Sequence, residues 1–142
     1  MTVGSLLHGK GDAVVTARPD QPVDEIVAIL VEHRIGAVLI MDGDDIAGIL
    51  SERDVVRCLG KRGDEVLHAP ASDIMTAEVE TVTPDESIPS ALAHMTRRRI
   101  RHLPVLDQGR LAGIVSIGDL VKRRIEEAEA EAETLKDYIQ HS

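Results

Sequence analysis

Short apolar and polar stretches alternate along the chain in a recognisable order. Apolar residues between Val23 and Val31 recur at three- and four-residue spacings, which predicts an amphipathic helix. Two short apolar stretches follow, at 37–41 and 47–50, and the polar residues that join them have the chemistry of a hairpin turn. A second helix is expected to begin near Glu52, with Ser51 at its N-cap. With a short strand before the first helix, the predicted order is strand, helix, strand, strand, helix.

The same order returns further along the chain. Thr16–Val56 aligns without a gap with Thr81–Val121, which lies 65 residues later, and the identical pairs include Gly48/Gly113. Composition alone does not keep glycines and carboxylates in register over such a length, so the chain contains an internal duplication. The second copy predicts these elements: a helix carrying Ile88, Ala91, Leu92 and Met95, strands at 102–106 and 112–115, and a helix from near Gly118.

The duplication sets the expected fold. Two strands cannot bury a pair of helices alone, so we expect a mixed α/β (α+β) fold in which two β-α-β-β-α repeats pack sheet to sheet with pseudo-twofold symmetry. The expected organisation is a first repeat at 8–62, a linker at 63–72, a second repeat at 73–125 and a charged helix or tail at 126–142. The tail has no wide apolar stripe; a solvated helix and a helix that contributes to self-association both remain open.

Composition and charge exclude several functions. Tyr138 is the only aromatic residue, so the chain has no platform on which to stack the bases of single-stranded nucleic acid. The net charge of -9 also disfavours binding to nucleic acid or to an anionic membrane. The single cysteine, Cys58, allows no internal disulfide or thiolate metal cluster, and a reducing cytoplasm is the expected location. No apolar run has the length of a signal peptide or a membrane span.

Four sequence segments resemble a known family. Gly48–Asp54 and Gly113–Asp119 both read Gly-aliphatic-aliphatic-Ser-x-x-Asp, between the last strand and the last helix of each copy. This pattern resembles the signature of the cystathionine-β-synthase (CBS) domain. Arg101–Val105 is similar to a strand of that family, and Asp73–Thr76 resembles the segment that usually opens such a repeat. The resemblance covers about 13–125, nearly the whole chain.

The resemblance implies a tandem pair of CBS domains, or Bateman module, that binds an adenosyl ligand in clefts between its repeats. The usual ligands are AMP, ADP, ATP, NAD(H) and S-adenosylmethionine, and many such modules form homodimers. These pairs generally regulate another protein. A non-enzymatic sensor is therefore expected, with no required cofactor, a regulated protein partner that the sequence does not identify, and an adenine nucleotide as ligand. The alternative is a structural adaptor whose ligand cleft is vestigial. An enzyme is not expected, since no nucleophile, base or metal-ligand set converges in the sequence.

The signature also has a physical rationale. Each signature glycine is expected to end a strand where a side chain would crowd whatever lies above it. Ser51 and Ser116 are expected at helix N-termini, where N–H groups and the helix dipole favour a phosphate. Asp54 and Asp119 follow three residues later, and a carboxylate there can accept both hydroxyls of a ribose. The same Ser-x-x-Asp spacing is also that of an ordinary helix cap.

The two copies differ in charge. Ile117 and Gly118 replace Glu52 and Arg53, so the helix start is uncharged in the second copy. Arg97–Arg99 have the ordinary role of cations at a helix C-terminus.

Arg101 and His102 lie beyond that helix end, and by resemblance they are expected near a polyphosphate. We therefore predict one nucleotide site dominated by the second copy, with Arg53 reaching across to it, and a weaker or vacant site near Asp54. Val82 and Ile100 are expected to hold the adenine between aliphatic side chains. The complete set of expected ligand-binding residues is Ser51, Arg53, Asp54, Met75, Thr81, Val82, Ile100, Arg101, His102, Leu103, Pro104, Ser116, Ile117, Gly118 and Asp119.

Overall fold

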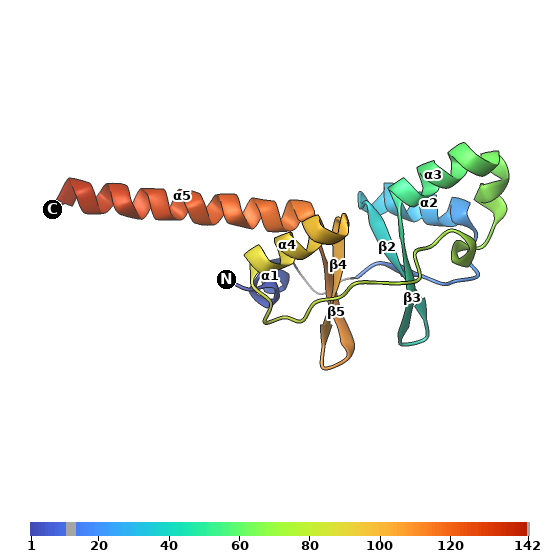
Figure 1. Cartoon of the computed structure of the whole chain (residues 1–142), viewed down its shortest axis with the longest axis horizontal. Coiled ribbons are helices and arrows are strands. Elements are labelled where there is room, and N and C mark those ends of the chain that lie inside the picture. The colour runs from blue at the N-terminus through green and yellow to red at the C-terminus, as the bar shows by residue number, and fades with distance from the viewer. Residues whose placement is uncertain (11–13, 142) are drawn as a thin grey trace. The chain divides into compact units, whose positions relative to one another are not determined.

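A computed structural model describes residues 1–10 and 14–141, and its helices and strands form two compact units (Figure 1). One unit is Ala13–Glu80; the other combines Met1–Asp12 with Thr81–Ser142. The fold is mixed α/β with two small sheets, which confirms the expected class. The elements are α1 (Val3–Lys10), β1 (Thr16–Ala17), α2 (Val23–His33), β2 (Ala37–Asp42), β3 (Asp45–Ser51), α3 (Glu52–Arg62), the 3₁₀ helices η1 (Gly63–His68) and η2 (Ala71–Asp73), α4 (Ile88–Arg98), β4 (His102–Asp107), β5 (Arg110–Ser116) and α5 (Ile117–His141).

The unit Ala13–Glu80 has a three-stranded sheet. β1 runs parallel to β2, and β2 pairs antiparallel with β3, so that Ala37 lies opposite Ser51. The hairpin strands are longer than the sequence predicted, because their pairing continues to Asp42 and Asp45. Arg34 is the C-cap of α2: it adopts the left-handed conformation and donates its N–H to carbonyls of the last helical turn. The predicted order of elements is confirmed for this repeat.

The stretch that was expected to be a linker is ordered and packed. Residues 63–68 and 71–73 form η1 and η2, and Val66 and Ala71 are fully buried in the core of the unit. Further on, Thr76 exchanges two backbone hydrogen bonds with Ile49 of β3, at 2.8 and 2.9 Å. The chain after α3 therefore closes the core of the first repeat.

The second unit repeats this plan with one substitution. β4 and β5 form a two-stranded antiparallel sheet, and a single parallel bridge from Val82 to Val105 stands where β1 stands in the other unit. The N-terminal helix α1 packs here: Val3 and Leu6 lie in this core, and the Val3 N–H donates to the Glu86 carbonyl at 2.9 Å. The N-terminal helix thus completes the unit of the second repeat, and its residues 8–10, which were expected in the first repeat, lie in this unit.

α5 continues as one helix from Ile117 to His141. Its first turns pack through Leu120 into the core of their unit, whereas residues 128–141 are all exposed. None of the helices in the described ranges 1–10 and 14–141 has the length and apolarity needed to cross a membrane.

Candidate functional site

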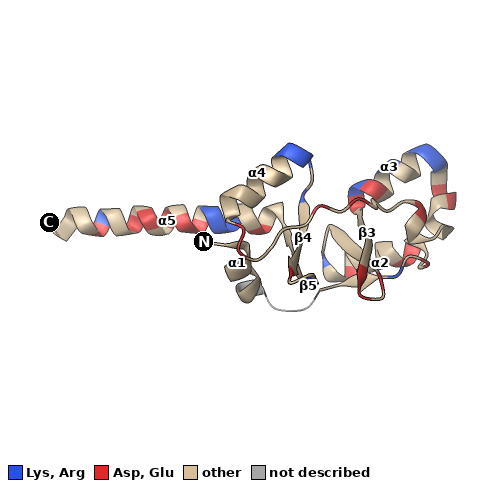
Figure 2. Cartoon of the chain, turned by 60° about the horizontal axis from the view of Figure 1, so that its bottom comes forward, with Lys and Arg blue, Asp and Glu red and all other residues tan. Residues whose placement is uncertain are grey.

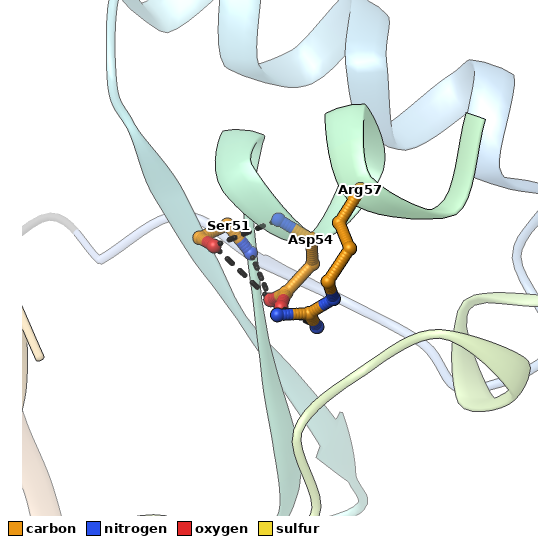
Figure 3. Close-up of polar contacts among 3 residues, drawn as sticks. All are labelled: Ser51, Asp54 and Arg57. Carbon is orange, nitrogen blue, oxygen red and sulfur yellow. Dashed lines mark hydrogen bonds and ion pairs between the residues drawn. The ribbon is translucent and has the colours of Figure 1, made fainter. Parts of the chain in front are cut away.

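Both copies of the signature form a reciprocal helix cap. In the first repeat the Asp54 N–H donates to Ser51 Oγ at 3.2 Å, and the Asp54 carboxylate accepts from the Ser51 N–H at 2.9 Å (Figure 3). In the second repeat the Asp119 N–H donates to Ser116 Oγ at 3.1 Å, and Asp119 accepts from the Ser116 N–H at 2.8 Å. Each pair satisfies two backbone donors that a helix start leaves without intrahelical partners. The signature therefore has a structural role in both repeats.

Asp54 is more heavily engaged than a cap requires. Its Oδ1 accepts from Arg57 at 2.8 Å, while its Oδ2 accepts from both the N–H and the hydroxyl of Ser51 (Figure 3). Asp54 is 6% exposed, although the Arg57 side chain is 57% exposed. Asp54 therefore already accepts three hydrogen bonds from its own repeat. At the position of Arg57 the second repeat has Lys122.

Backbone hydrogen bonds connect the start of the hairpin to the start of the following helix. The Ile117 N–H donates to the Arg101 carbonyl at 2.8 Å, and His102 lies opposite Ser116 in the β4–β5 pairing. The backbone of Arg101 therefore lies next to the N-terminal turn of α5, which is capped by Asp119, and the Arg101 side chain is exposed. These are the candidate residues that the structure brings together in the second unit.

The first repeat has the same backbone arrangement with different side chains. There the Glu52 N–H donates to the Gly36 carbonyl at 2.9 Å, and Ala37 lies opposite Ser51. Gly36 carries no charge where Arg101 carries one, and Glu52 adds a negative charge at the helix start. A phosphate would therefore be attracted more strongly to the helix start of the second repeat. Arg53 is exposed on the first turn of α3, and its reach towards a phosphate stays a prediction.

Several other candidate residues are buried in the core of their own unit. Leu103 and Pro104 are buried, and so is Val82, whose N–H donates to the Pro104 carbonyl and whose carbonyl accepts from Leu106. These three residues can shape a ligand site but present little surface of their own. Three further candidates are half-buried and lie nearer the surface: Thr81, Ile100 and Ile117.

The signature glycines lie within strands, so the expectation that they end them is wrong. β3 and β5 continue three residues further, to Ser51 and Ser116. A Cβ on Gly48 would lie 2.6 Å from Met75 Sδ and 2.8 Å from the Thr76 carbonyl oxygen. In the second unit a Cβ on Gly113 would lie 2.7 Å from a methyl carbon of Leu7 in α1. The groups that approach each glycine closely therefore belong to the protein itself and not to a ligand. The missing side chain of Gly48 leaves room for Met75 to lie against β3.

The electrostatics of the second unit concentrate positive charge near the candidate site. α4 ends in Arg97 and Arg98, and its C-cap Arg99 is left-handed; this end of the α4 ribbon has the blue of Lys and Arg residues in Figure 2. Before the other end of α4, two hydrogen bonds lower the pKa of Asp85. The larger effect comes from the Thr83 hydroxyl and the smaller from the backbone N–H of Asp85 itself.

Within residues 1–10 and 14–141 no group of His, Cys, Asp and Glu side chains is arranged to hold a metal ion.

Sequence reasoning did not find two of these contacts. The Arg57–Asp54 ion pair has a detectable signal, because side chains three residues apart lie on one face of a helix. The contact of Leu7 with Gly113 has none, since it joins segments that are distant in sequence.

Comparisons with known proteins agree with this architecture. The family model of the CBS domain matches residues 11–61 and again 71–126. The CBS domain-containing protein CBSX3, mitochondrial, of Arabidopsis thaliana is 32% identical over 148 residues, which cover 98% of this chain and 72% of the relative. The crystal structure of the CBS-domain containing protein ATU1752 from Agrobacterium tumefaciens is similar with a TM-score of 0.84 and 41% identity, over 87% of this chain and 92% of that one.

Two similar structures contain adenosyl compounds. The CBS domain protein PAE2072 from Pyrobaculum aerophilum, complexed with AMP, has a TM-score of 0.74 and 27% identity over 84% of this chain and 89% of that one. The CBS domain pair of protein MJ0100, in complex with 5-methylthioadenosine and S-adenosyl-L-methionine, has a TM-score of 0.79 and 25% identity over 89% of this chain and 98% of that one.

Proposed function

The chain belongs to the CBS-domain family, and from this premise we propose that it is a regulatory protein that binds an adenosyl ligand without catalysis. Stand-alone CBS-domain pairs are generally regulatory rather than catalytic. The proposed ligand is an adenine nucleotide: AMP, ADP, ATP or NAD(H). Relatives that hold AMP, 5-methylthioadenosine or S-adenosyl-L-methionine support the adenosyl part of this proposal.

One observation carries the choice of the second repeat. The Ile117 N–H donates to the Arg101 carbonyl, so the backbone that carries a permanently charged side chain lies next to the start of α5, which is capped by Asp119. A nucleotide needs this combination, because its ribose hydroxyls donate to a carboxylate and its phosphates are attracted by a guanidinium and a helix dipole. In the first repeat, Gly36 stands in place of Arg101.

The proposal assigns a role to each of the following candidate residues. Arg101 contacts phosphate, Asp119 accepts from the ribose, and His102, Ser116 and Gly118 complete the polar edge of the site. The buried residues Val82, Leu103 and Pro104 support the site from beneath. The candidates Ser51, Arg53, Asp54 and Met75 lie in the unit Ala13–Glu80, and the contribution of Arg53 to phosphate binding stays a prediction.

A thermal-shift panel tests the proposal. The protein is heated with AMP, ADP, ATP, NAD, NADH or S-adenosylmethionine, and ligand at about 100 times Kd should add about 2.7 kcal/mol to the free energy of unfolding. This corresponds to a rise in Tm of several degrees. No shift with any of the six would overturn the proposal and favour the structural adaptor.

Isothermal titration calorimetry with the ligand that gives a shift then tests the site. Asp119→Asn removes the charge but keeps an oxygen for the cap, so binding should weaken by about tenfold to a hundredfold, as for loss of a charged hydrogen bond. Asp54→Asn is the matched control and should leave the affinity unchanged. Arg101→Ala should weaken the binding of ligands that carry phosphates. Arg110→Ala, at the opposite end of β5 from Ser116, should leave their binding unchanged. The opposite result for either pair would place the site elsewhere.

The proposal includes a homodimer and a regulated protein partner. Val31 and Val56 are 72% and 68% exposed, on the neighbouring helices α2 and α3, and a second copy is the proposed cover for this surface. Sedimentation of the purified chain measures its oligomeric state directly. A cytoplasmic location stays a prediction that depends on the single cysteine.

A further inference from the structure

The exposed part of α5 carries an apolar face with a regular period. Its residues follow one another at spacings of four, three, four, three and four: Val121, Ile125, Ala128, Ala132, Leu135 and Ile139. This is the a/d pattern of a coiled coil, with a at Ile125 and d at Ala128. Ile125, Leu135 and Ile139 are 54%, 60% and 65% exposed. An otherwise acidic and polar helix thus presents large aliphatic side chains to solvent on one side.

The elements of its own unit do not cover this face. α5 extends past α4 and the β4–β5 hairpin, and all of residues 128–141 are exposed (Figure 1). The segment Ile125–Ile139 spans 15 residues, or about 21 Å of helix. Its length is two heptads, which is enough for a defined seam but too short to be strong alone.

The charges beside the seam select its partner. In the same heptad, Arg124 and Glu131 occupy g positions, while Glu129 and Lys136 occupy e positions. In a parallel pair in register, each g side chain faces the e side chain five residues later on the other helix. This places Arg124 opposite Glu129 and Glu131 opposite Lys136, so both contacts join opposite charges. Along α5, basic residues at 122–124 precede an acidic run at 126–133, and Lys136 follows this run (Figure 2).

An antiparallel pair has the opposite outcome. If Ile125 lies against Leu135 of the other helix, each side chain at a g position faces a g position of the other helix, and each side chain at an e position faces an e position. Glu131 then faces Glu131 and Glu129 faces Glu129, which places like charges together beside the seam. The Arg124 side chain, 53% exposed, now pairs with Glu127 of its own helix at 3.3 Å, and such an exposed pair is weak enough to exchange partners.

We propose that the face of α5 from Ile125 to Ile139 docks on the same face of a second copy of this chain, as a parallel two-stranded coiled coil. This interaction surface is separate from the ligand site. It rests on the proposed homodimer, which it deepens by assigning residues and an orientation to one contact between the copies.

Site-specific cross-linking of the full chain tests the proposal. In a Cys58→Ser background, Leu135→Cys places a thiol at a d position, and Ala130→Cys places one at an f position on the opposite side of the helix. A symmetric parallel seam brings the two copies of residue 135 within disulfide range. Under mild oxidation, Leu135→Cys should form dimers at least about tenfold faster than Ala130→Cys. Equal rates would overturn the proposal, as would faster cross-linking in a mixture of Ile125→Cys and Leu135→Cys chains than in either alone.

Charge exchange adds a second readout. Glu131→Lys in the Leu135→Cys chain places a second positive charge opposite Lys136 and should slow cross-linking. Adding Lys136→Glu restores the opposite charges and should restore the rate; failure to restore it would count against the parallel register. Sedimentation separates the two proposals: a dimeric chain without the cross-link at 135 overturns only the seam, whereas a chain that stays monomeric overturns the homodimer as well.

Discussion

Replacing Gly48 by alanine should destabilise the protein far more than the same change at its repeat equivalent, Gly113. A Cβ at Gly48 would lie 2.8 Å from the carbonyl oxygen of Thr76. That carbonyl cannot retreat freely, because it accepts from the Ile49 N–H at 2.9 Å and the Thr76 N–H donates back to Ile49 at 2.8 Å. The added methyl group must therefore strain β3 or the segment that lies over it.

The magnitude follows from these contacts. Overpacking of a fixed environment costs about 1–3 kcal/mol, and weakening the two backbone hydrogen bonds adds about 1 kcal/mol. Replacing glycine within a strand offsets about 0.5–1 kcal/mol of this cost, because the backbone entropy of the unfolded chain becomes smaller. Gly48→Ala should therefore cost about 2 kcal/mol, which is a fall in Tm of roughly 8 °C for a chain of this length.

Gly113→Ala is the internal control. Its Cβ would meet two methyl carbons of Leu7, at 2.7 and 3.3 Å, which are the mobile ends of a half-buried side chain. Leu7 can change rotamer, so the cost is offset by the same entropic gain, and the net effect should be within about 1 kcal/mol of zero. The far-UV circular dichroism of both variants is followed in urea and on heating. Destabilisation by Gly113→Ala equal to or larger than that by Gly48→Ala would refute the reasoning.

Two further substitutions test the polar contacts. Arg57→Ala removes the ion pair of Asp54 and should lower the free energy of unfolding by about 0.5–1 kcal/mol, because Arg57 is largely solvated; Arg53→Ala, on the same helix, is the control for loss of a charge, and equal effects on Tm would contradict the prediction. Thr83→Val removes the strongest cause of the lowered pKa of Asp85, so this pKa should rise towards its ordinary value of 3.8 in an NMR titration of the carboxyl carbon. Since the folded pKa lies below the unfolded one, the contribution of this carboxylate is complete above about pH 4 and is lost as the pH falls through the folded pKa. An unchanged titration in the variant would contradict the assignment of the Thr83 hydroxyl as donor.

Local patterns in the sequence were sufficient for the elements of each repeat. The spacing of apolar residues predicted α2 and α4. Polar turn residues between two short apolar stretches predicted both hairpins. The Ser-x-x-Asp spacing predicted the caps, because both residues of a cap lie within one turn. These features depend on neighbours in sequence, and they needed no knowledge of the rest of the chain.

Segments that pack through isolated apolar residues could not be predicted in this way. Residues 63–72 include several polar residues as well as Gly63 and Pro70, which is typical of a linker, yet Val66 of η1 is fully buried in the core and Leu67 packs against it. α1 has no strong apolar face, and its place beside β5 depends on Val3, Leu6 and Leu7 meeting residues some eighty or more positions later. Periodicity carries no information about such non-local contacts.

The duplication makes it possible to separate residues that build the fold from residues that determine the ligand. Ser51 and Asp54 repeat as Ser116 and Asp119, and the reciprocal cap explains this identity in both units without reference to any ligand. Identity between the repeats is therefore weak support for a binding site. The differences are more informative, because a single backbone plan presents Arg101 in one repeat and an uncharged glycine in the other. The side chain of Arg101 has no part in the cap, and a guanidinium near a helix start adds to the attraction of that start for an anion such as a phosphate. This is why the proposed nucleotide site is assigned to the second repeat.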